Sequence, residues 1–482
     1  MVVGGVTAAI VLGGAAVAGV SLAQPAPNTI TPPPAFTPAQ SQAYAGNDWI
    51  NAQGGDVLGD RYSTLTTINS TNVGTLQQAW ATDLGVCPSH TSSCGSFEAS
   101  PAEYEGTLYI QHPGGGIYAL NATTGQVLWN FKPPYATWDP GFQAGSGGRQ
   151  PGVTVANGLV FAGFADGSLV ALNAQTGQVA WRTVVGPWQE GVRLSAAPTY
   201  YNGIIYMATA GGDGGGISCQ VMAFNALNGA LLWSWGVVPQ AGQPGANTWS
   251  TGGGGVSVGN AYGGGALWET PAVDPKDGVM IIGTGNPVPW NSRGPGKNLY
   301  TDAIVALDLY SGQLKWAYQT VHHDLWDSDL PNSMIVFNTK MKAGPDAGKS
   351  VTAVVDVAKF GWTWLLNAKT GKPLTKVDQV KVPVDSAPGV NSWPTQPIPQ
   401  TPNTLSPAFP SMKNGSGRLC SSAQYWDEPM TTSDGHPIVF GCFFDPYDTT
   451  SWNVVPFENM DWPASSYSPI THGFVTCGDN GR

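Results

Sequence analysis

Apolar residues flank a recurring polar turn in five segments of the chain. In each copy, apolar residues lead into Asn or Asp, a Gly follows four positions later, and further apolar residues lead to a Trp in the first four copies. The segments are 119–129 (ALNATTGQVLW), 171–181 (ALNAQTGQVAW), 223–233 (AFNALNGALLW), 306–316 (ALDLYSGQLKW) and 365–374 (LLNAKTGKPL). Asn or Asp caps a tight turn and Gly supplies a positive φ, so each segment predicts a β-hairpin.

The five copies start 52, 52, 83 and 59 residues apart. A period near fifty residues is typical of a four-stranded propeller blade. A second short apolar run precedes two of the repeats, at 158–163 and 203–208. The pattern therefore predicts an all-β protein, a β-propeller, in which the closing Trp residues pack between blades and have no chemical role.

Composition supports short strands joined by turns. Charged residues make up only 11% of the 482 residues, while Gly (64), Pro (39) and Trp (19) are plentiful. A helical bundle needs many more charged residues on its outer faces. The net charge of −11 argues against nucleic acid as a partner and against anionic lipid surfaces.

The first 46 residues differ from the rest of the chain. Residues 2–23 carry no charge and end in Ser-Leu-Ala, a small-x-small pattern, so residues 1–23 are interpreted as a secretory signal peptide. The signal lacks a positively charged start, and the alternative is an uncleaved membrane anchor. We expect a linker at 24–46, a propeller domain at 47–482, no membrane span after signal cleavage, and a periplasmic or extracellular protein.

The six cysteines fit an exported protein with disulfides better than a metal site. The expected local pairs are Cys87 with Cys94 and Cys420 with Cys442. The sequence contains no Cys-x-x-Cys-His, so we expect no covalently attached haem.

Chemistry is expected where the repeat is interrupted. The 83-residue interval holds an insertion at 239–265 rich in Gly, Ala and Ser, which leads into GGGALW at 263–268 and GTGNPVPW at 283–290. The run TVHHDLWDSD follows the fourth repeat at 320–329. Loops on a rigid scaffold commonly carry a binding site, and this density of Trp, Asn, Asp and His exceeds what blades need.

The Trp repeat, GGGALW, TGNPVPW and HHDLWDSD, in that order, resemble the pyrroloquinoline-quinone (PQQ)-dependent alcohol dehydrogenases. The resemblance runs from about residue 48 to the C-terminus. It implies an eight-bladed propeller that holds PQQ near its axis together with one metal ion. A cation that polarises a quinone carbonyl makes it a better hydride acceptor, and hard cations prefer oxygen ligands.

The resemblance also implies roles for individual residues. Trp268 matches the aromatic floor under the quinone, Lys359 the basic residue at the quinone oxygens, and Asp327 the catalytic base. The implied cofactor contacts are Glu98, Arg149, Ser195, Gly211, Gly212, Trp268 and Lys359. The implied metal ligands are Asp213, Asn286, Asp327 and Asp329. The pair His322 and His323 is expected to be structural.

The sequence departs from the family pattern in four places. Many members have a vicinal Cys pair where residues 144–149 read AGSGGR, which also shifts the spacing of Arg149. Asp213 replaces a Glu ligand. Asp329 adds a carboxylate that is associated with lanthanides in some alcohol dehydrogenases but also occurs in the glucose branch. The C-terminal blades are expected to be incomplete, because residues 461–469 resemble an element that normally precedes further blades.

The expected function is oxidation of an alcohol or sugar hydroxyl by hydride transfer to metal-polarised PQQ. Calcium is the first expectation for the metal, with a lanthanide or magnesium as alternatives, and electrons are expected to pass to an external cytochrome c or quinone. The rival hypothesis is a non-catalytic propeller that acts as a binding or assembly scaffold. The Trp repeat fits both hypotheses, whereas a scaffold has no need of the three loop motifs together.

Overall fold

The computed structural model describes most of the chain from Trp49 onward. The described residues are 49–51, 55–85, 97–113, 115–141, 152–212, 217–249, 262–289, 296–384, 391–400, 438–440, 444, 452–454 and 465–478. The expected signal peptide, linker and both expected cysteine pairs lie outside these residues. No helix among the described ranges has the length and apolar character needed to cross a bilayer.

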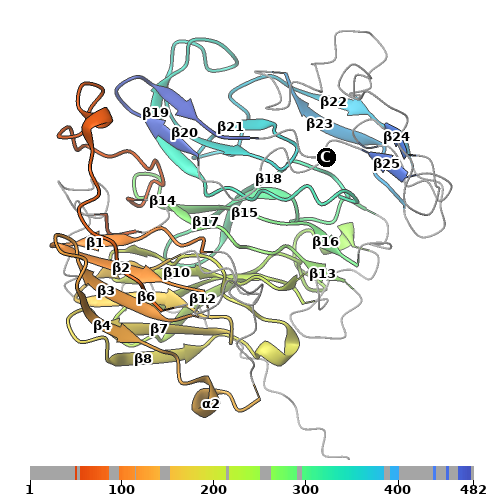
Figure 1. The fold of residues 1–482 in the computed structure, drawn as a ribbon. Coiled ribbons are helices and arrows are strands. Elements are labelled where there is room, and N and C mark those ends of the chain that lie inside the picture. The colour runs from red at the N-terminus through yellow and green to blue at the C-terminus, as the bar shows by residue number, and fades with distance from the viewer. Residues whose placement is uncertain are drawn as a thin grey trace, which may run out of the picture.

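Four antiparallel sheets of four strands follow one another in chain order (Figure 1). Their strands are β1 (Ala102–Tyr104), β2 (Thr107–Gln111), β3 (Ile117–Asn121) and β4 (Val127–Phe131); β5 (Thr154–Ala156), β6 (Leu159–Gly163), β7 (Ser168–Asn173) and β8 (Val179–Val184); β9 (Thr199–Tyr201), β10 (Ile204–Ala208), β11 (Gln220–Asn225) and β12 (Leu231–Gly236); and β14 (Ala272–Asp274), β15 (Val279–Gly283), β17 (Ala303–Asp308) and β18 (Leu314–Gln319). Each sheet contains one of the first four repeats, which confirms the predicted hairpins.

The remaining described strands form smaller sheets. A three-stranded sheet comprises β19 (Ile335–Lys340), β20 (Ser350–Val357) and β21 (Thr363–Asn367). Two-stranded pairs are formed by β13 (Gly263–Gly264) with β16 (Pro287–Val288), β22 (Val377–Lys381) with β23 (Thr395–Pro399), β24 (Ile438–Phe440) with β25 (Trp452–Val454), and β26 (Ser466–Ser468) with β27 (Gly473–Val475). The short helices are η1 (Val73–Thr75), α2 (Tyr135–Trp138), η2 (Trp188–Glu190) and η3 (Ala246–Thr248).

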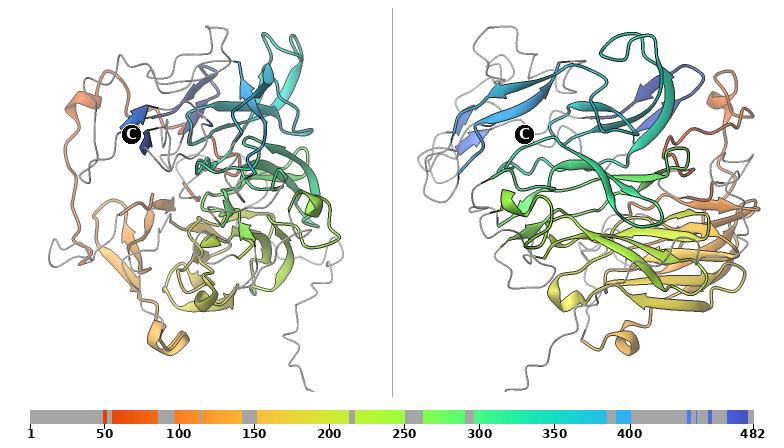
Figure 2. Two further views of the ribbon diagram at one scale, coloured as in Figure 1. Left: turned by 90° about the vertical axis from the view of Figure 1, so that its right-hand side faces the viewer. Right: turned by 180° about the vertical axis from the view of Figure 1, so that it is seen from behind.

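The sheets are arranged as propeller blades around a common centre (Figure 2). Contacts run in sequence between the first strands of successive sheets, from β1 to β5, β9, β14, β19 and β26. The hydrophobic clusters draw buried side chains from neighbouring blades, so the core is a series of blade-to-blade layers. The all-β propeller prediction is confirmed; the expected number of eight blades stays a prediction.

The polar turn of the repeat forms as the sequence predicts. In the first copy the Asn121 side chain accepts hydrogen bonds from the amides of Thr123 and Thr124, at 2.9 and 3.0 Å. Gly125 then adopts φ +71° and donates its amide to the Asn121 carbonyl at 2.8 Å. A left-handed residue in this position is readily supplied only by Gly, and it places the next strand back against its partner.

Each closing Trp packs on the turn of the following blade. Its indole N–H donates to the carbonyl of the residue that follows the turn Asn or Asp, and its ring covers the turn Gly. The hydrogen bonds join Trp80 to Ala122, Trp129 to Ala174, Trp181 to Ala226, Trp233 to Leu309 and Trp316 to Ala368, at 2.9–3.1 Å. Trp80 belongs to no recognised repeat, so only the structure shows that it continues this series to the first blade.

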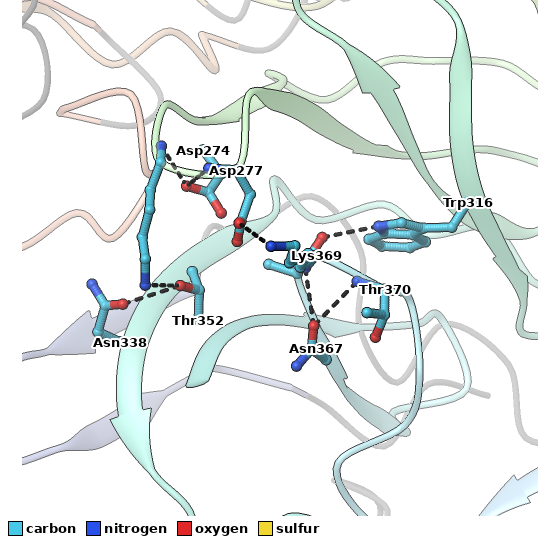
Figure 3. A network of polar contacts seen from close by, with 10 residues as sticks. Asp274, Asp277, Trp316, Asn338, Thr352, Asn367, Lys369 and Thr370 are labelled. Atoms are coloured by element: carbon cyan, nitrogen blue, oxygen red, sulfur yellow. Dashed lines mark hydrogen bonds and ion pairs between the residues drawn. The ribbon is translucent and has the colours of Figure 1, made fainter. Parts of the chain in front are cut away.

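The contact between the fourth and fifth blades shows this arrangement in detail (Figure 3). Trp316 reaches the turn in which Asn367 accepts the amides of Lys369 and Thr370, both at 3.1 Å. Lys369 also lies 3.7 Å from Asp277 of the β14–β15 turn. The fifth copy lacks the closing Trp, and its outer strand is reduced to a single bridge between Leu366 and Pro373.

We expect Gly312→Ala to destabilise the fold more than Gly278→Ala. Both glycines have positive φ, +67° and +68°, so Ala costs about 1–2 kcal/mol at either position. A Cβ on Gly312 would lie 2.4 Å from the Trp233 ring, whereas a Cβ on Gly278 meets open space. Overpacking adds about 1–3 kcal/mol at Gly312 alone. Denaturant unfolding of the two variants checks the difference, and equal losses would contradict the Trp packing.

A segment near the N-terminus crosses the centre of the blades. Residues 49–51 and 55–60 make backbone hydrogen bonds to the first strands of five of them, which ties blades that are far apart in sequence. The pairs are Trp49 with Glu103, Ile50 with Val155, Val57 with Val273, Leu58 with Val336 and Asp60 with Tyr467, at 2.7–2.9 Å. Gly59 (φ +73°) allows this path because a Cβ there would lie 2.4 Å from the Met334 carbonyl oxygen.

Candidate cofactor and metal site

The loop between β18 and β19 carries the predicted catalytic base. Its apolar residues Leu325, Trp326 and Leu330 are buried in the core cluster between the fourth and fifth blades. Trp326 packs edge-on against Phe444, with ring centroids 5.1 Å apart. Asp327 follows with φ +61° and is partly exposed, so the buried anchors hold the loop while the carboxylate faces the site.

Asp324 closes this loop. Its fully buried carboxylate accepts the amide of Trp326 at 2.8 Å, the amide of Ser328 at 2.8 Å and the Ser328 hydroxyl at 2.7 Å. Asp324 therefore caps the turn of this loop. Asp327 itself is left available for other partners.

Lys359 is the centre of the site. It lies on the tight turn after β20, only 3% exposed, and its ammonium is 2.9 Å from Asp327 Oδ2 and 2.8 Å from Asp329 Oδ2. The same ammonium lies 5.1 Å from the centre of the Trp268 ring, a cation–π distance. One buried cation therefore brings together two of the predicted carboxylates and the predicted aromatic floor.

Asp329 joins the fourth and fifth blades. Its Oδ1 accepts a hydrogen bond from the backbone N–H of Asn286 at 2.6 Å, and its backbone carbonyl accepts one from the backbone N–H of Lys359 at 3.1 Å. Gly285 is required for this approach, because a Cβ there would lie 2.6 Å from Asp329 Oδ1. The TGN motif, the Trp-Asp-Ser-Asp run and the Lys359 turn are thereby held in one arrangement.

The side chain of Asn286 has the features of a ligand. The residue is fully buried, and its amide nitrogen donates to the Pro287 carbonyl at 3.2 Å. Its Oδ1 has no hydrogen-bond partner among the described residues. A buried amide oxygen without a partner is costly, and a hard cation satisfies it. The donor set therefore fits the metal that the resemblance implies.

The pairing of β13 with β16 brings Asn286 beside the GGGALW motif at 263–268. The Asn286 carbonyl accepts the Gly265 amide at 2.8 Å, and β13 pairs with β16. Gly264 in turn is close to Gly212, where a Cβ would lie 3.0 Å from the Gly264 Cα. The predicted Gly212 therefore borders β13, which pairs with the strand that directly follows Asn286. Gly211 directly precedes Gly212, and a Cβ added to Gly211 would lie 2.0 Å from the Gly191 carbonyl oxygen.

The pKa values of Asp327 and Lys359 are both raised, for different reasons. Burial and the neighbouring Asp329 raise the pKa of Asp327 to about 7, although Lys359 opposes the rise. Burial opposes the charge on Lys359, but Asp329 and Asp327 together hold its pKa above the ordinary lysine range. Lys359 is therefore a permanent cation, while Asp327 exchanges a proton near neutral pH.

The two histidines before this loop have backbone partners. His323 Nδ1 lies 2.7 Å from the Gly296 carbonyl and His322 Nδ1 lies 3.0 Å from that of Thr395. The His322 backbone also exchanges two hydrogen bonds with the Gln396 side chain of β23, at 2.7 and 2.8 Å. These contacts agree with the structural role expected for the pair.

We expect His322 to make the protein acid-sensitive. Burial, aided by the charge of Lys297, lowers its pKa to about 4. Because the unfolded imidazole titrates near 6.5, acidification below pH 6.5 protonates the unfolded chain first. The free energy of unfolding therefore falls with pH, by about 3 kcal/mol at pH 4. Unfolding curves of wild type and His322→Asn check this, with exposed His472→Asn as control; equal acid sensitivity of all three proteins would contradict it.

The structure brings together five of the predicted site residues through direct contacts: Trp268, Asn286, Asp327, Asp329 and Lys359. Glu98 and Ser195 are half-buried on the segments that lead into β1 and β9, and their cofactor contacts stay predictions. Arg149 and Asp213 lie outside the described residues. Within the described part of the chain, no three His, Cys, Asp or Glu side chains form a metal-binding group.

Sequence reasoning missed two buried acids near the site. Asp324 lies in the quoted motif, and its signal is the Asp-x-x-x-Ser spacing of a side-chain-closed turn. Glu269 follows Trp268, is 2% exposed, and accepts the Ser333 hydroxyl at 2.7 Å. No local pattern marks Glu269, because Ser333 lies 64 residues away.

Known proteins match this chain over most of its length. The family model described as "PQQ: Glucose/ethanol/alcohol dehydrogenase, beta-propeller domain" matches residues 49–476. The quinoprotein alcohol dehydrogenase PedH of Pseudomonas putida is 34% identical over 334 residues, 67% of this chain and 54% of the relative. The quinohemoprotein alcohol dehydrogenase of Comamonas testosteroni is 30% identical over 349 residues, 70% of this chain and 47% of the relative.

Solved structures agree with the sequence comparison. The crystal structure of the Comamonas testosteroni enzyme aligns with a TM-score of 0.64 and 26% identity, over 90% of this chain and 58% of that chain. A europium-containing methanol dehydrogenase aligns with a TM-score of 0.61 at 22% identity, over 89% and 68%, which shows a shared fold. The chain spans about half the length of the curated relatives it matches. By its family match and its relatives, the chain belongs to the PQQ-dependent glucose/ethanol/alcohol dehydrogenase family of β-propellers.

Proposed function

We propose that this protein is a PQQ-dependent dehydrogenase that oxidises the hydroxyl group of an alcohol or sugar. The observation that carries the proposal is the convergence on Lys359 of two carboxylates and an aromatic ring, beside a buried amide oxygen without a partner. These groups come from loops separated by up to 91 residues, and they are the residues to which the resemblance assigns cofactor and metal roles. Relatives named as quinoprotein and quinohemoprotein alcohol dehydrogenases support the same activity.

The residues divide between cofactor and metal. The Trp268 ring offers a flat surface for an aromatic quinone, and Lys359 offers a fixed positive charge at its edge. Asn286 Oδ1 and the Asp327 carboxylate offer oxygen ligands to a metal ion. Asp213 and Asp329 are the two further ligands of the proposed metal site. Calcium is the first candidate, with a lanthanide or magnesium as alternatives. When bound, PQQ supplies an electrophilic carbonyl that accepts a hydride from the alcohol carbon.

The protein's own part in the reaction is proton transfer and orientation. Asp327 accepts the proton of the substrate hydroxyl, a task for a carboxylate that the ion pair with Lys359, at 2.9 Å, holds in place. Lys359 holds Asp327 and Asp329 in fixed positions through two ion pairs. The buried loop anchors exclude water from the back of the site. Electrons then leave to an external cytochrome c or quinone, in the periplasm or outside the cell.

A non-catalytic scaffold is the weaker hypothesis. Burying an ammonium and two carboxylates costs desolvation energy, and apolar residues of similar size are often at least as stable. An amide oxygen without a partner adds to that cost. A scaffold propeller gains nothing from either feature, whereas a cofactor and a cation use both.

Reconstitution tests the proposal. Purified protein is incubated with PQQ and calcium, magnesium or a lanthanide, and dye reduction is measured with small alcohols, polymeric alcohols and glucose. We expect metal-dependent dye reduction and a PQQ absorbance that stays with the protein on gel filtration. Protein with metal but no PQQ is the control. A folded protein that retains no PQQ and reduces no dye with any metal would refute the dehydrogenase proposal.

A further inference from the structure

The carboxylate of Asp324 uses both of its oxygens within the loop that carries Asp327. Oδ1 accepts the Trp326 amide at 2.8 Å and the Ser328 hydroxyl at 2.7 Å, while Oδ2 accepts the Ser328 amide at 2.8 Å. Asp324 is fully buried, so these hydrogen bonds do not compete with water. The two amides that it binds flank Asp327 directly, one on each side.

This closure holds Asp327 in a backbone conformation that L-residues rarely adopt. With φ +61°, Asp327 needs its neighbours to hold it there, because the left-handed region is unfavourable for a residue with a Cβ. Trp326 is fixed from outside the loop by Phe444. Ser328, fully buried, is fixed by Asp324 through both its amide and its hydroxyl. The direction of the Asp327 side chain therefore depends on Asp324.

Another aspartate in the chain shows what a simpler turn requires. Asp308, in the fourth repeat, accepts two amides and the Ser311 hydroxyl through Oδ1 alone, at 2.9–3.0 Å. Its Oδ2 pairs with the exposed Lys315. The other four repeats have Asn at this position, which supplies the single acceptor oxygen that the turn needs. The Asp324 loop needs two acceptor oxygens, which Asn does not have.

We propose that Asp324 is a positioning residue for the reaction: it does not touch substrate or cofactor, but it aims the Asp327 carboxylate at the metal and at the substrate hydroxyl. This inference rests on the proposed function. In Asp324→Asn the NH₂ group faces either the Trp326 amide or the Ser328 amide, so in both orientations a donor meets a donor and one hydrogen bond is lost. Asp308→Asn is the matched control, because it keeps the acceptor oxygen of its turn and lies in a repeat turn away from Lys359.

The kinetic test uses the PQQ-loaded enzyme with its metal. A displacement of a reacting group by about 1 Å can lower kcat by about 10²-fold. We expect Asp324→Asn to lower kcat by that order while KM for the alcohol stays within about twofold, because substrate binding surfaces are unchanged. Asp308→Asn is expected to match wild type in both parameters. Wild-type kcat in Asp324→Asn, or equal losses in both variants, would overturn the proposal.

Two further measurements do not depend on turnover. With Eu³⁺ as the bound metal, a displaced Asp327 admits water to the ion, so the luminescence lifetime is expected to shorten in Asp324→Asn but not in Asp308→Asn. Hydrogen exchange of a peptide covering residues 321–330 is expected to accelerate only in Asp324→Asn, with no ligand present. Unchanged exchange of this peptide would refute the positioning role. If wild type shows no dehydrogenase activity but the exchange difference is found, the proposed function fails and the control of the loop by Asp324 stands.

Discussion

Asp327→Asn is expected to lower kcat by about 10²–10⁴-fold in the PQQ- and metal-loaded enzyme. The variant keeps the size of the side chain but removes the base that takes the substrate proton. Its fold is expected to persist, because the Lys359 ammonium keeps its 2.8 Å contact with Asp329. Dye-reduction kinetics at saturating alcohol check this prediction.

The free energy of unfolding of Asp327→Asn shows whether a loss of turnover comes from the missing base or from a damaged fold. The pKa of Asp327 is raised to about 7, chiefly by burial and Asp329, so the fold does not favour its charged form. By linkage, such a carboxyl contributes less stability as pH rises from about 4 to 7, and replacing it with a neutral amide costs little at neutral pH. Asp308→Asn provides the activity control. Wild-type turnover in Asp327→Asn would show that another group is the base.

Lys359→Met is expected to lower the free energy of unfolding of the ligand-free protein by about 3–5 kcal/mol at neutral pH. The loss arises because the buried Asp329 and the partly buried Asp327 are left without a cation. The folded pKa of Lys359 is raised, so its stabilising effect is fully present below the ordinary lysine pKa and is lost only in strong alkali. Denaturant unfolding at neutral pH measures the full effect.

An exposed lysine provides the matched control for this substitution. Lys369 is 73% exposed and pairs with Asp277 at 3.7 Å, so Lys369→Met is expected to cost no more than about 1 kcal/mol. Calcium is expected to restabilise Lys359→Met more than wild type, since it replaces the missing cation between the carboxylates. Equal losses in the two lysine variants would contradict the buried ion pairs.

The fold was largely predictable because its signals are local. The turn Asn or Asp, the Gly four residues later and the apolar flanks act within one hairpin, and the structure forms each of them. Loss of the closing Trp in the fifth copy coincides with an outer strand reduced to one bridge. Trp80 was not recognised, because its turn partners at Ala122 and Gly125 are more than forty residues away.

The candidate site was predictable as a set of residues but not as an arrangement. The motifs around Trp268, Asn286 and Asp327 identify which side chains to consider. Their spacing does not say that Lys359 contacts Asp327 and Asp329 together, or that Asn286 leaves an oxygen without a partner. Those facts depend on how the fourth and fifth blades face each other.

The sequence by itself determined the repeating hairpins, the propeller class and the family motifs, since each depends on residues a few positions apart. Only the tertiary structure decided that Asp324 closes the loop and that Asp327 reaches Lys359. Asp324 and Asp327 are chemically alike and three residues apart, and their roles differ because one is buried beside two backbone amides while the other is turned towards Lys359. Turns and motifs depend on residues that are close in sequence, whereas burial and charge pairing arise only when distant blades pack together.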